Sequence, residues 1–273
     1  KNYILEKVIP LSTDPNDSDS DDDGFSDSLE NDVGSDPNDT ASTPMQIGLQ
    51  AYYPFDGDAS DTSGNNRHGT IYGATNGTDR FNQPDKTLSF DGTNDYVSIP
   101  YGSSVNTANQ SFSISTWAKL RTTNYQNEII EQASSQNVGR SILYININRL
   151  LTTAAGGTGV PATGHQISDE EWYNFVLSVL YNSGTDASTL KLYSNGLEVA
   201  SYVRANPESS SSSINYLIGK SYQNSGYFNG WLDDIRFYNR ALSADEVNAT
   251  YQVTKFTNVA PSDLSISSGT VTE

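Results

Sequence analysis

The stretch from Gly230 to Val247 most constrains the fold of this chain, because it predicts a strand followed at once by a helix. Its first half opens on a glycine and crowds large apolar and aromatic side chains into a short run, which is typical of a strand. In its second half, Ser243 is followed three residues later by Glu246. This spacing is a capping box and predicts a short helix of about two turns, with Leu242 and Val247 closing a hydrophobic staple around its start.

Two adjacent carboxylates, Asp233 and Asp234, interrupt the predicted strand. Neighbouring residues of a strand point to opposite faces, so at least one carboxylate is expected on the buried side. Burying a carboxylate is costly unless a cation or several donors meet it. Arg236 shares a face with Asp234 and is expected to pair with it. Asp233 has no such partner nearby in the sequence, which favours a metal ion for it.

The residues from Gly230 to Ser243 resemble the closing motif of laminin G-like, concanavalin A-like sandwich domains of bacterial surface proteins. The similarity covers about residues 48 to 252. Further blocks in the order of that family are Ala51–Gly57, Asp61–Thr70, Leu88–Val97, Phe112–Trp117, Glu171–Tyr173 and Leu190–Gly196. The resemblance implies an all-β fold: a two-sheet antiparallel jelly-roll sandwich with a short C-terminal helix.

Runs rich in apolar and β-branched residues predict the strands of this sandwich. Asn195-Gly196, between two such runs, is a strong hairpin signal. Trp117 is expected to face away from Phe112 and Ile114, either as a stacking platform for a sugar ring or as an aromatic packed beneath a neighbouring loop. The predicted strands include 47–55, 88–90, 96–99, 112–118, 128–130, 141–147, 173–181, 190–194, 197–203 and 216–219.

An acidic segment near the N-terminus carries the spacing of an EF-hand calcium loop. Gly24 stands at the sixth position, where the loop turns sharply, and Glu30 at the twelfth can supply two oxygens. A solvated acidic linker is the alternative, since runs of charge usually are linkers. The complete register favours calcium. The predicted Ca²⁺ ligands are Asp19, Asp21, Asp23, the carbonyl of Phe25, Asp27 and Glu30.

A short repeat flanks this loop, because the run that begins at Asp14 recurs at Asp36. The pair resembles thrombospondin type-3-like calcium repeats, in which successive loops share ions and stiffen a stalk. The resemblance makes Asp14, Asn16, Asp36 and Asn38 further candidate ligands.

A second calcium site is implied by the likeness to the sandwich family. In that family calcium commonly lies where the opening loop approaches the last strand, which would group Asp56 and Asp61 with Asp233. All three supply the hard oxygen ligands that suit calcium rather than zinc. The alternative is that Asp56 and Asp61 only cap turns.

These patterns divide the chain into three parts. Residues 1–44 are predicted to be a small, loop-rich, calcium-binding module, and residues 45–255 the sandwich. Residues 256–273 resemble a linker and the first strand of a cadherin-like repeat, so neighbouring domains of a longer chain are the expected partners. The chain does not begin with methionine, and we expect it to be a piece of a longer protein.

Charge and motif content narrow the function. A net charge of -18 argues against binding nucleic acid or an anionic membrane surface, and no apolar run is long enough to insert into a bilayer. The chain has no Glu-x-Asp-x-x-Glu pattern and no Gly-x-Ser-x-Gly elbow, and its two histidines are His68 and His165. We therefore predict a protein that is not an enzyme.

The sequence favours a non-catalytic, calcium-dependent binding or adhesion module of a large bacterial protein that is secreted or held at the cell surface. The expected partner is a glycan or another cell-surface ligand, bound by loop residues. The candidate ligand-binding residues are Tyr125, Trp117, Tyr222, Asn224 and Tyr227. The alternatives are an accessory domain of a secreted polysaccharide-degrading enzyme and a calcium-stiffened spacer that binds no other ligand.

Overall fold

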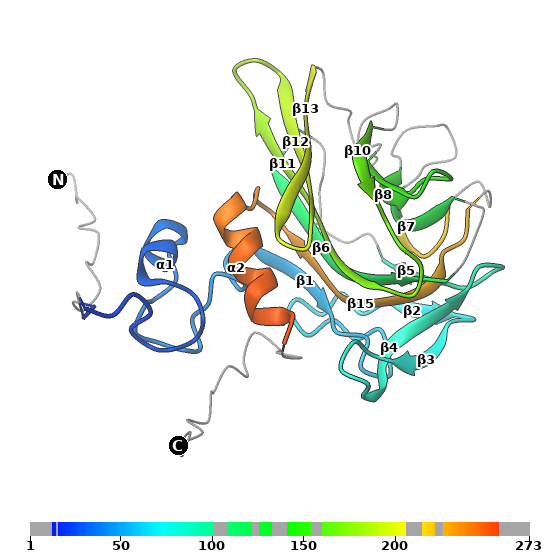
Figure 1. Ribbon diagram of the computed structural model, residues 1–273, viewed down its shortest axis with the longest axis horizontal. Helices are drawn as coiled ribbons and strands as arrows, with labels where there is room; N and C mark the ends of the chain where they lie inside the picture. The colour runs from blue at the N-terminus through cyan, green and yellow to red at the C-terminus, as the bar shows by residue number, and fades with distance from the viewer. Residues whose placement is uncertain are drawn as a thin grey trace. The chain divides into compact units, whose positions relative to one another are not determined.

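The structure, a computed structural model, describes residues 13, 14, 16–100, 109–121, 126–132, 141–153, 160–205, 215–221 and 226–256. These residues fall into two compact units. One is residues 48–251, and the other is the described part of 1–47 together with 252–256. The larger unit is a sandwich of two antiparallel sheets, which confirms the predicted fold (Figure 1). The cadherin-like segment beyond residue 256 lies outside the described residues, and so do Tyr125, Tyr222 and Asn224.

The larger sheet has eight strands. In spatial order they are β13 (Leu197–Ala205), β12 (Ala187–Ser194), β11 (Trp172–Asn182), β6 (Phe112–Leu120), β15 (Asn229–Tyr238), β4 (Pro84–Asp91) and β3 (Thr75–Thr78), and β1 (Leu49–Tyr53) pairs with β15. The second sheet has seven: β10 (Val160–Gln166), β9 (Leu150–Thr153), β8 (Ser141–Ile145), β7 (Asn127–Gln132), β14 (Tyr216–Ile218), β5 (Tyr96–Ile99) and β2 (Thr70–Tyr72).

Alternation along the strands builds the core between the two sheets. In β11, Phe175 and Leu177 are buried in the core, while Val176 belongs to a second cluster on the opposite face. This strand pairs with β6 on one side and β12 on the other, so its apolar character on both faces correctly predicts a central position. The hairpin between β12 and β13 is also confirmed, because Asn195 and Gly196 both have positive φ, as a tight two-residue turn requires.

Gly230, the second residue of β15, allows this strand to lie close to β6. A Cβ atom on Gly230 would lie 2.1 Å from the carbonyl oxygen of Lys119 in β6, so a larger residue does not fit at this crossing. The sequence did not predict β2, β3, β9 or β10. The first three have only three or four residues, and β10 contains Pro161 and Gly164, so cross-strand pairing rather than hydrophobic pattern defines all four.

Helix α2 (Ala244–Thr254) follows β15 and is longer than the two turns predicted. The capping box is present: the Ser243 N–H donates to the Glu246 carboxylate at 2.9 Å, and the Glu246 N–H donates to the Ser243 hydroxyl at 3.2 Å. Leu242 and Val247 lie in one buried cluster with Val176, as the staple predicts. The start of α2 therefore packs on the face of the larger sheet that points away from the core.

The smaller unit contains one short helix, α1 (Asp27–Val33). Ser26 caps its first turn by accepting a hydrogen bond from the Leu29 N–H. Gly34, with φ of 91°, ends it in the left-handed conformation and donates its N–H to the Glu30 carbonyl. The helix begins inside the predicted calcium loop and places Glu30 on its inner side, where the side chain is buried.

Candidate functional site

The acidic loop folds around its own backbone amides. One carboxylate oxygen of Asp19 accepts the Gly24 N–H at 3.0 Å, and one of Asp23 accepts the Phe25 N–H at 2.8 Å. Asp21 uses one oxygen in the same way, accepting the Asp23 N–H at 3.3 Å. Each of the three aspartates therefore commits a single oxygen to the turn of the loop and directs the other elsewhere.

The remaining oxygens of this loop are buried without hydrogen-bond partners among the described residues. They are Asp19 Oδ1, Asp21 Oδ2, Asp23 Oδ2 and both carboxylate oxygens of Glu30. One ligand atom from each of the three aspartates lies within 4.8 Å of the others. Buried carboxylates this close repel one another and lose hydration, an arrangement that a bound cation would stabilise.

The pKa values of the loop carboxyls reflect the same repulsion and loss of hydration. Glu30 is fully buried. Burial, together with the charges of Asp23 and the other loop aspartates, raises its pKa to about 8, which the nearby Ser35 hydroxyl opposes only in part. Burial and the charges of Asp21 and Asp19 raise the pKa of Asp23 to about 7. Without a cation, these two carboxyls hold protons that ordinary aspartate and glutamate have lost near neutral pH.

Asp27 is placed differently from the other predicted ligands. Its two oxygens accept the N–H and the hydroxyl of Ser20, both at 2.8 Å, and these bonds outweigh burial and lower its pKa. Asp27 therefore closes the loop onto α1 rather than facing the unpartnered oxygens. The Phe25 side chain is buried, and the role of its carbonyl as a ligand remains a prediction.

The flanking repeat forms matching exposed turns. Asp14 accepts the Asn16 N–H at 2.9 Å, and Asp36 accepts the Asn38 N–H at 3.1 Å. These four residues are not part of the cluster of unpartnered oxygens, and their role as calcium ligands remains a prediction.

Asp56, Asp61 and Asp233 each have a partner of their own among the described residues, and their role as shared calcium ligands remains a prediction. Asp56 lies 2.9 Å from the Lys86 ammonium in a partly exposed pair. Asp61 accepts backbone N–H groups of Tyr52, Ser63 and Arg67 at 2.9–3.0 Å. Burial alone would raise the pKa of Asp61, but these bonds lower it overall. Asp61 thus organises the loop that follows β1, which agrees with the turn-capping alternative.

Asp233 forms an ion pair with an arginine that is distant in the sequence. Arg80, in the connection between β3 and β4, lies 2.6 Å from Asp233 and 2.7 Å from Asp234, and its side chain is 4 % exposed. Asp79 positions the arginine by accepting the Phe81 and Gln83 N–H groups in a tight turn. Asp233 therefore has a protein cation that is distant in the sequence, while its Oδ1 is buried without a hydrogen-bond partner among the described residues, and a metal ion at Asp233 remains a prediction.

A β-bulge explains how one arginine reaches both carboxylates. The register of β15 against β6 shifts between Asp233 and Arg236, and Asp234 has φ of 52°. The extra residue turns both carboxylates to the same face, where strict alternation would have separated them. Arg236 pairs with Asp234 at 3.3 Å, as predicted, and the Tyr52 hydroxyl donates to the same carboxylate.

Trp117 is covered and does not offer a platform for a sugar ring. It faces away from the core, as predicted, but is only 4 % exposed. Its ring stacks on Tyr251 of α2, with 5.8 Å between centroids, and the Arg80 guanidinium lies 4.6 Å from its ring centre. Tyr227, the other described candidate, is half-buried at a bridge with Lys220, whose ammonium also lies 4.3 Å from the Tyr96 ring centre.

The two histidines make structural contacts. His68 Nδ1 accepts the backbone N–H of Asp61 at 3.1 Å. His165 lies in β10, with Nε2 2.9 Å from the hydroxyl of Ser194. Burial lowers the pKa of His165, and Ser194 is 2 % exposed. Sequence reasoning missed this pair because the two residues lie 29 positions apart, on strands of different sheets that only the tertiary structure brings together.

The sandwich, with a helix packed on its larger sheet, defines the class of protein. The family described as the concanavalin A-like lectin/glucanases superfamily matches residues 91–248. The chain belongs to this family. A comparison with curated protein sequences finds no match.

Solved structures share the sandwich at low sequence identity. One is domain 4 of AbnA, an extracellular GH43 arabinanase from Geobacillus stearothermophilus, in complex with arabinotriose. It is 21% identical with a TM-score of 0.57, and the match covers 73% of this chain and 96% of that one.

Two further structures are similar. The binding domain of botulinum neurotoxin serotype D is 14% identical, with a TM-score of 0.57 over 78% of this chain. Trypanosoma rangeli sialidase in complex with sialic acid is 15% identical, with a TM-score of 0.56 over 76% of this chain.

Coverage differs among these structures. This chain spans about half of the neurotoxin chain (53%) and a third of the sialidase chain (33%). At these identities the likeness concerns the fold. Within the described residues, neither helix has the length and apolar character needed to cross a membrane.

Proposed function

We propose that this chain is a non-catalytic, calcium-binding and carbohydrate-binding module of a larger extracellular bacterial protein that acts in adhesion. The observation that carries the proposal is the set of five buried carboxylate oxygens in the acidic loop that have no hydrogen-bond partner among the described residues. The thrombospondin-like repeat before the sandwich and the cadherin-like segment after it are part of this proposal.

The donor set of the loop fits calcium better than other common metals. Asp19, Asp21, Asp23 and Glu30 offer only oxygen, whereas zinc favours nitrogen and sulfur ligands. Calcium takes six to eight oxygens in flexible geometry, so the Phe25 carbonyl and water could complete its shell. A bound calcium would neutralise two charges in a chain whose net charge is -18.

The carbohydrate half of the proposal draws on the family. Membership in the lectin/glucanase superfamily and the arabinotriose bound by the arabinanase domain both support a saccharide ligand. The structural roles of the two histidines, and the arginine contacts of Asp233 and Asp234, support a binding role over a catalytic one.

Calcium titration by isothermal calorimetry tests the loop. The chain is expected to bind Ca²⁺ and to gain thermal stability from it, because a ligand of the folded state stabilises that state by mass action. Glu30→Gln should weaken calcium binding by at least about tenfold. Asp32→Asn, an exposed change in the same helix α1, is the matched control and should bind like the wild type. Equal affinity in all three proteins would contradict the site.

A glycan array tests the carbohydrate half separately. The chain, labelled and applied with calcium, is expected to bind a restricted set of saccharides. Repeating the array with a chelator asks whether that binding depends on calcium. Uniform absence of binding under both conditions would leave the calcium-stiffened spacer as the better description.

A further inference from the structure

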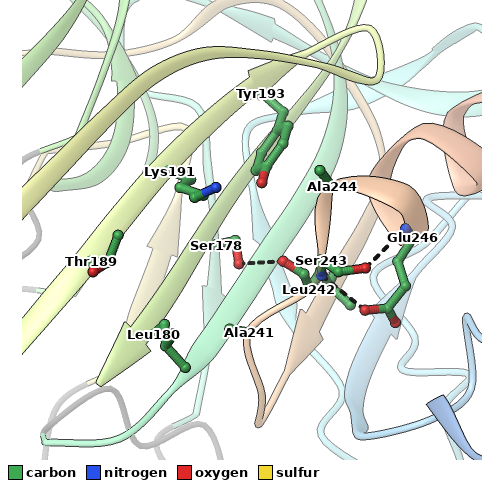
Figure 2. A pocket seen from close by; sticks show the side chains of 10 residues that line it. All are labelled: Ser178, Leu180, Thr189, Lys191, Tyr193, Ala241, Leu242, Ser243, Ala244 and Glu246. Atoms are coloured by element: carbon green, nitrogen blue, oxygen red, sulfur yellow. Dashed lines mark hydrogen bonds between the residues drawn. The ribbon is translucent and has the colours of Figure 1, made fainter. Parts of the chain in front are cut away.

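A cavity of about 390 Å³ lies on the outer face of the larger sheet. Strands β11 and β12 form its floor, and residues 241–246, which lead from β15 into α2, form its wall (Figure 2). Ligand pockets in proteins commonly measure ~300–1,000 Å³, so this cavity is large enough for a small ligand.

Strand register brings the floor residues onto one face. Ser178 of β11 lies opposite Lys191 of β12, and Leu180 lies opposite Thr189. These four side chains line the cavity together with Tyr193. The floor therefore alternates hydroxyl-bearing and aliphatic groups, and Leu180 is 57% exposed.

The wall of the cavity is fixed before any ligand arrives. The Ser178 hydroxyl donates to the Leu242 carbonyl at 2.8 Å and ties the wall to the floor. Glu246 accepts the Ser243 N–H in the capping box and lies 2.6 Å from the Arg240 guanidinium. Because this pocket is preformed, ordering its side chains on ligand binding costs little free energy.

The Tyr193 hydroxyl is a polar group of the cavity lining that the fold leaves unsatisfied. Tyr193 is 1% exposed, and its hydroxyl is buried with no hydrogen-bond partner among the described residues. Figure 2 shows this hydroxyl directed toward the space between Lys191, Ser178 and Ala244. Burial raises the pKa of Tyr193, so the group remains a hydrogen-bond donor at neutral pH. A buried hydroxyl without a partner is costly, and a ligand oxygen in the cavity would satisfy it.

The charges around the cavity favour a neutral ligand. Lys191 is already paired with Glu198 at 2.8 Å, and the Glu246 carboxylate is paired with Arg240. What remains is a set of hydroxyls beside aliphatic surface. Sugars present the matching chemistry, because their hydroxyls both donate and accept hydrogen bonds while their C–H faces contact apolar groups.

We propose that this cavity is the saccharide-binding site of the sandwich, with the Tyr193 hydroxyl as the donor that fixes one sugar oxygen. The inference rests on the proposed carbohydrate-binding function and adds the location and the neutral character of the ligand.

The test uses the whole chain, labelled with ¹⁵N, and a panel of neutral trisaccharides: arabinotriose, xylotriose, cellotriose and maltotriose. Binding is expected to shift the amide signals of Thr189, Lys191 and Tyr193. Tyr193→Phe should weaken the affinity about three- to tenfold, the value of one hydrogen bond. Thr189→Arg, which places a long side chain in the cavity, should abolish binding.

Tyr181→Phe is the matched control, because it removes a hydroxyl that contacts Asp186 and does not line the cavity. It should leave the affinity unchanged. Without ligand, Tyr193→Phe should keep or raise the melting temperature, because the hydroxyl it removes has no partner. A clear loss of stability would overturn the claim that the fold leaves this group unsatisfied.

The outcomes separate the two proposals. If no saccharide of the panel or of the glycan array binds, the carbohydrate function fails and the cavity assignment fails with it. If a saccharide binds but shifts signals elsewhere, or binds Thr189→Arg as it binds the wild type, the function stands and the cavity assignment is overturned.

Discussion

Individual buried carboxylates in this protein are stabilised in two different ways. Asp234 is fully buried, but Arg236 and Arg80 outweigh the effect of burial and hold its pKa below the ordinary value. Asp23 and Glu30 are equally buried and have no cation beside them among the described residues, so their pKa values rise. The pKa of Asp233 is raised as well, because burial and the charge of Asp234 outweigh Arg80. A metal bound in the acidic loop would change the charge state of Asp23 and Glu30.

The pH dependence of stability tests this contrast. In the calcium-free chain, the folded pKa values of Asp23 and Glu30, about 7 and 8, exceed the ordinary 3.8 and 4.5. The folded state then binds more protons than the unfolded state, so these groups lower stability as pH rises from about 4 to about 8. Calcium should reverse the trend, because it binds the ionised carboxylates.

Thermal unfolding at pH 5 to 8, with calcium removed or in excess, measures the effect. The readout is the difference between the wild type and Glu30→Gln, whose amide does not titrate. In the absence of calcium, the wild type should lose more stability than Glu30→Gln as pH rises. The same pH profile for both proteins would speak against a raised pKa at Glu30.

The β-bulge in strand β15 allows two charged residues to be buried on the outer face of the larger sheet. Its bulge places Asp233 and Asp234 together on the outer face, and the turn before β4 supplies Arg80 to both. Trp117 of β6 lies against the guanidinium and Tyr251 of α2 lies against Trp117. The charged cluster thus links β15, β6, α2 and the β3–β4 turn.

Removing the arginine should strongly destabilise the sandwich. Arg80→Met removes the guanidinium that contacts the buried carboxylates of Asp233 and Asp234. Breaking a buried ion pair typically costs about 3–5 kcal/mol of folding free energy. Chemical denaturation measures the free energy of unfolding. Lys86→Met, which breaks the partly exposed pair with Asp56, is the control and should cost less than about 1 kcal/mol. Restoration of Arg80→Met by calcium would instead favour the metal site predicted at Asp233.

For the molecule as a whole, the two compact units balance their acidity differently. The chain has 33 acidic and 15 basic residues. In the described part of the sandwich, the buried carboxylates Asp233 and Asp234 are met by arginine, and Asp61 is met by backbone amides. Among the described residues, Asp233 Oδ1 and Asp79 Oδ2 in the sandwich are buried without a hydrogen-bond partner, whereas in the N-terminal unit five such oxygens come from four residues close together in the sequence. Calcium is therefore expected to act on the N-terminal unit.

Local sequence patterns predicted those features whose residues lie a few positions apart in the chain. The capping box at Ser243, the Asn195-Gly196 hairpin, the central strand at Phe175 and the pairing of Arg236 with Asp234 all follow from residues a few positions apart. The loop from Asp19 to Glu30 belongs with them, because its oxygens converge through local turns.

Only the tertiary structure decided which groups meet across long separations. Asp233 finds its cation 153 residues earlier, and Trp117 is covered by a helix far along the chain. The cavity at Tyr193 exists because α2 packs beside β11 and β12. The sequence by itself indicated the strands, the capped helix and the acidic loop, since periodicity and spacing act over a few residues, and the motifs shared with the sandwich family indicated the two-sheet fold. It did not determine the bulge in β15 or the partners of buried groups, because those depend on which strands lie side by side.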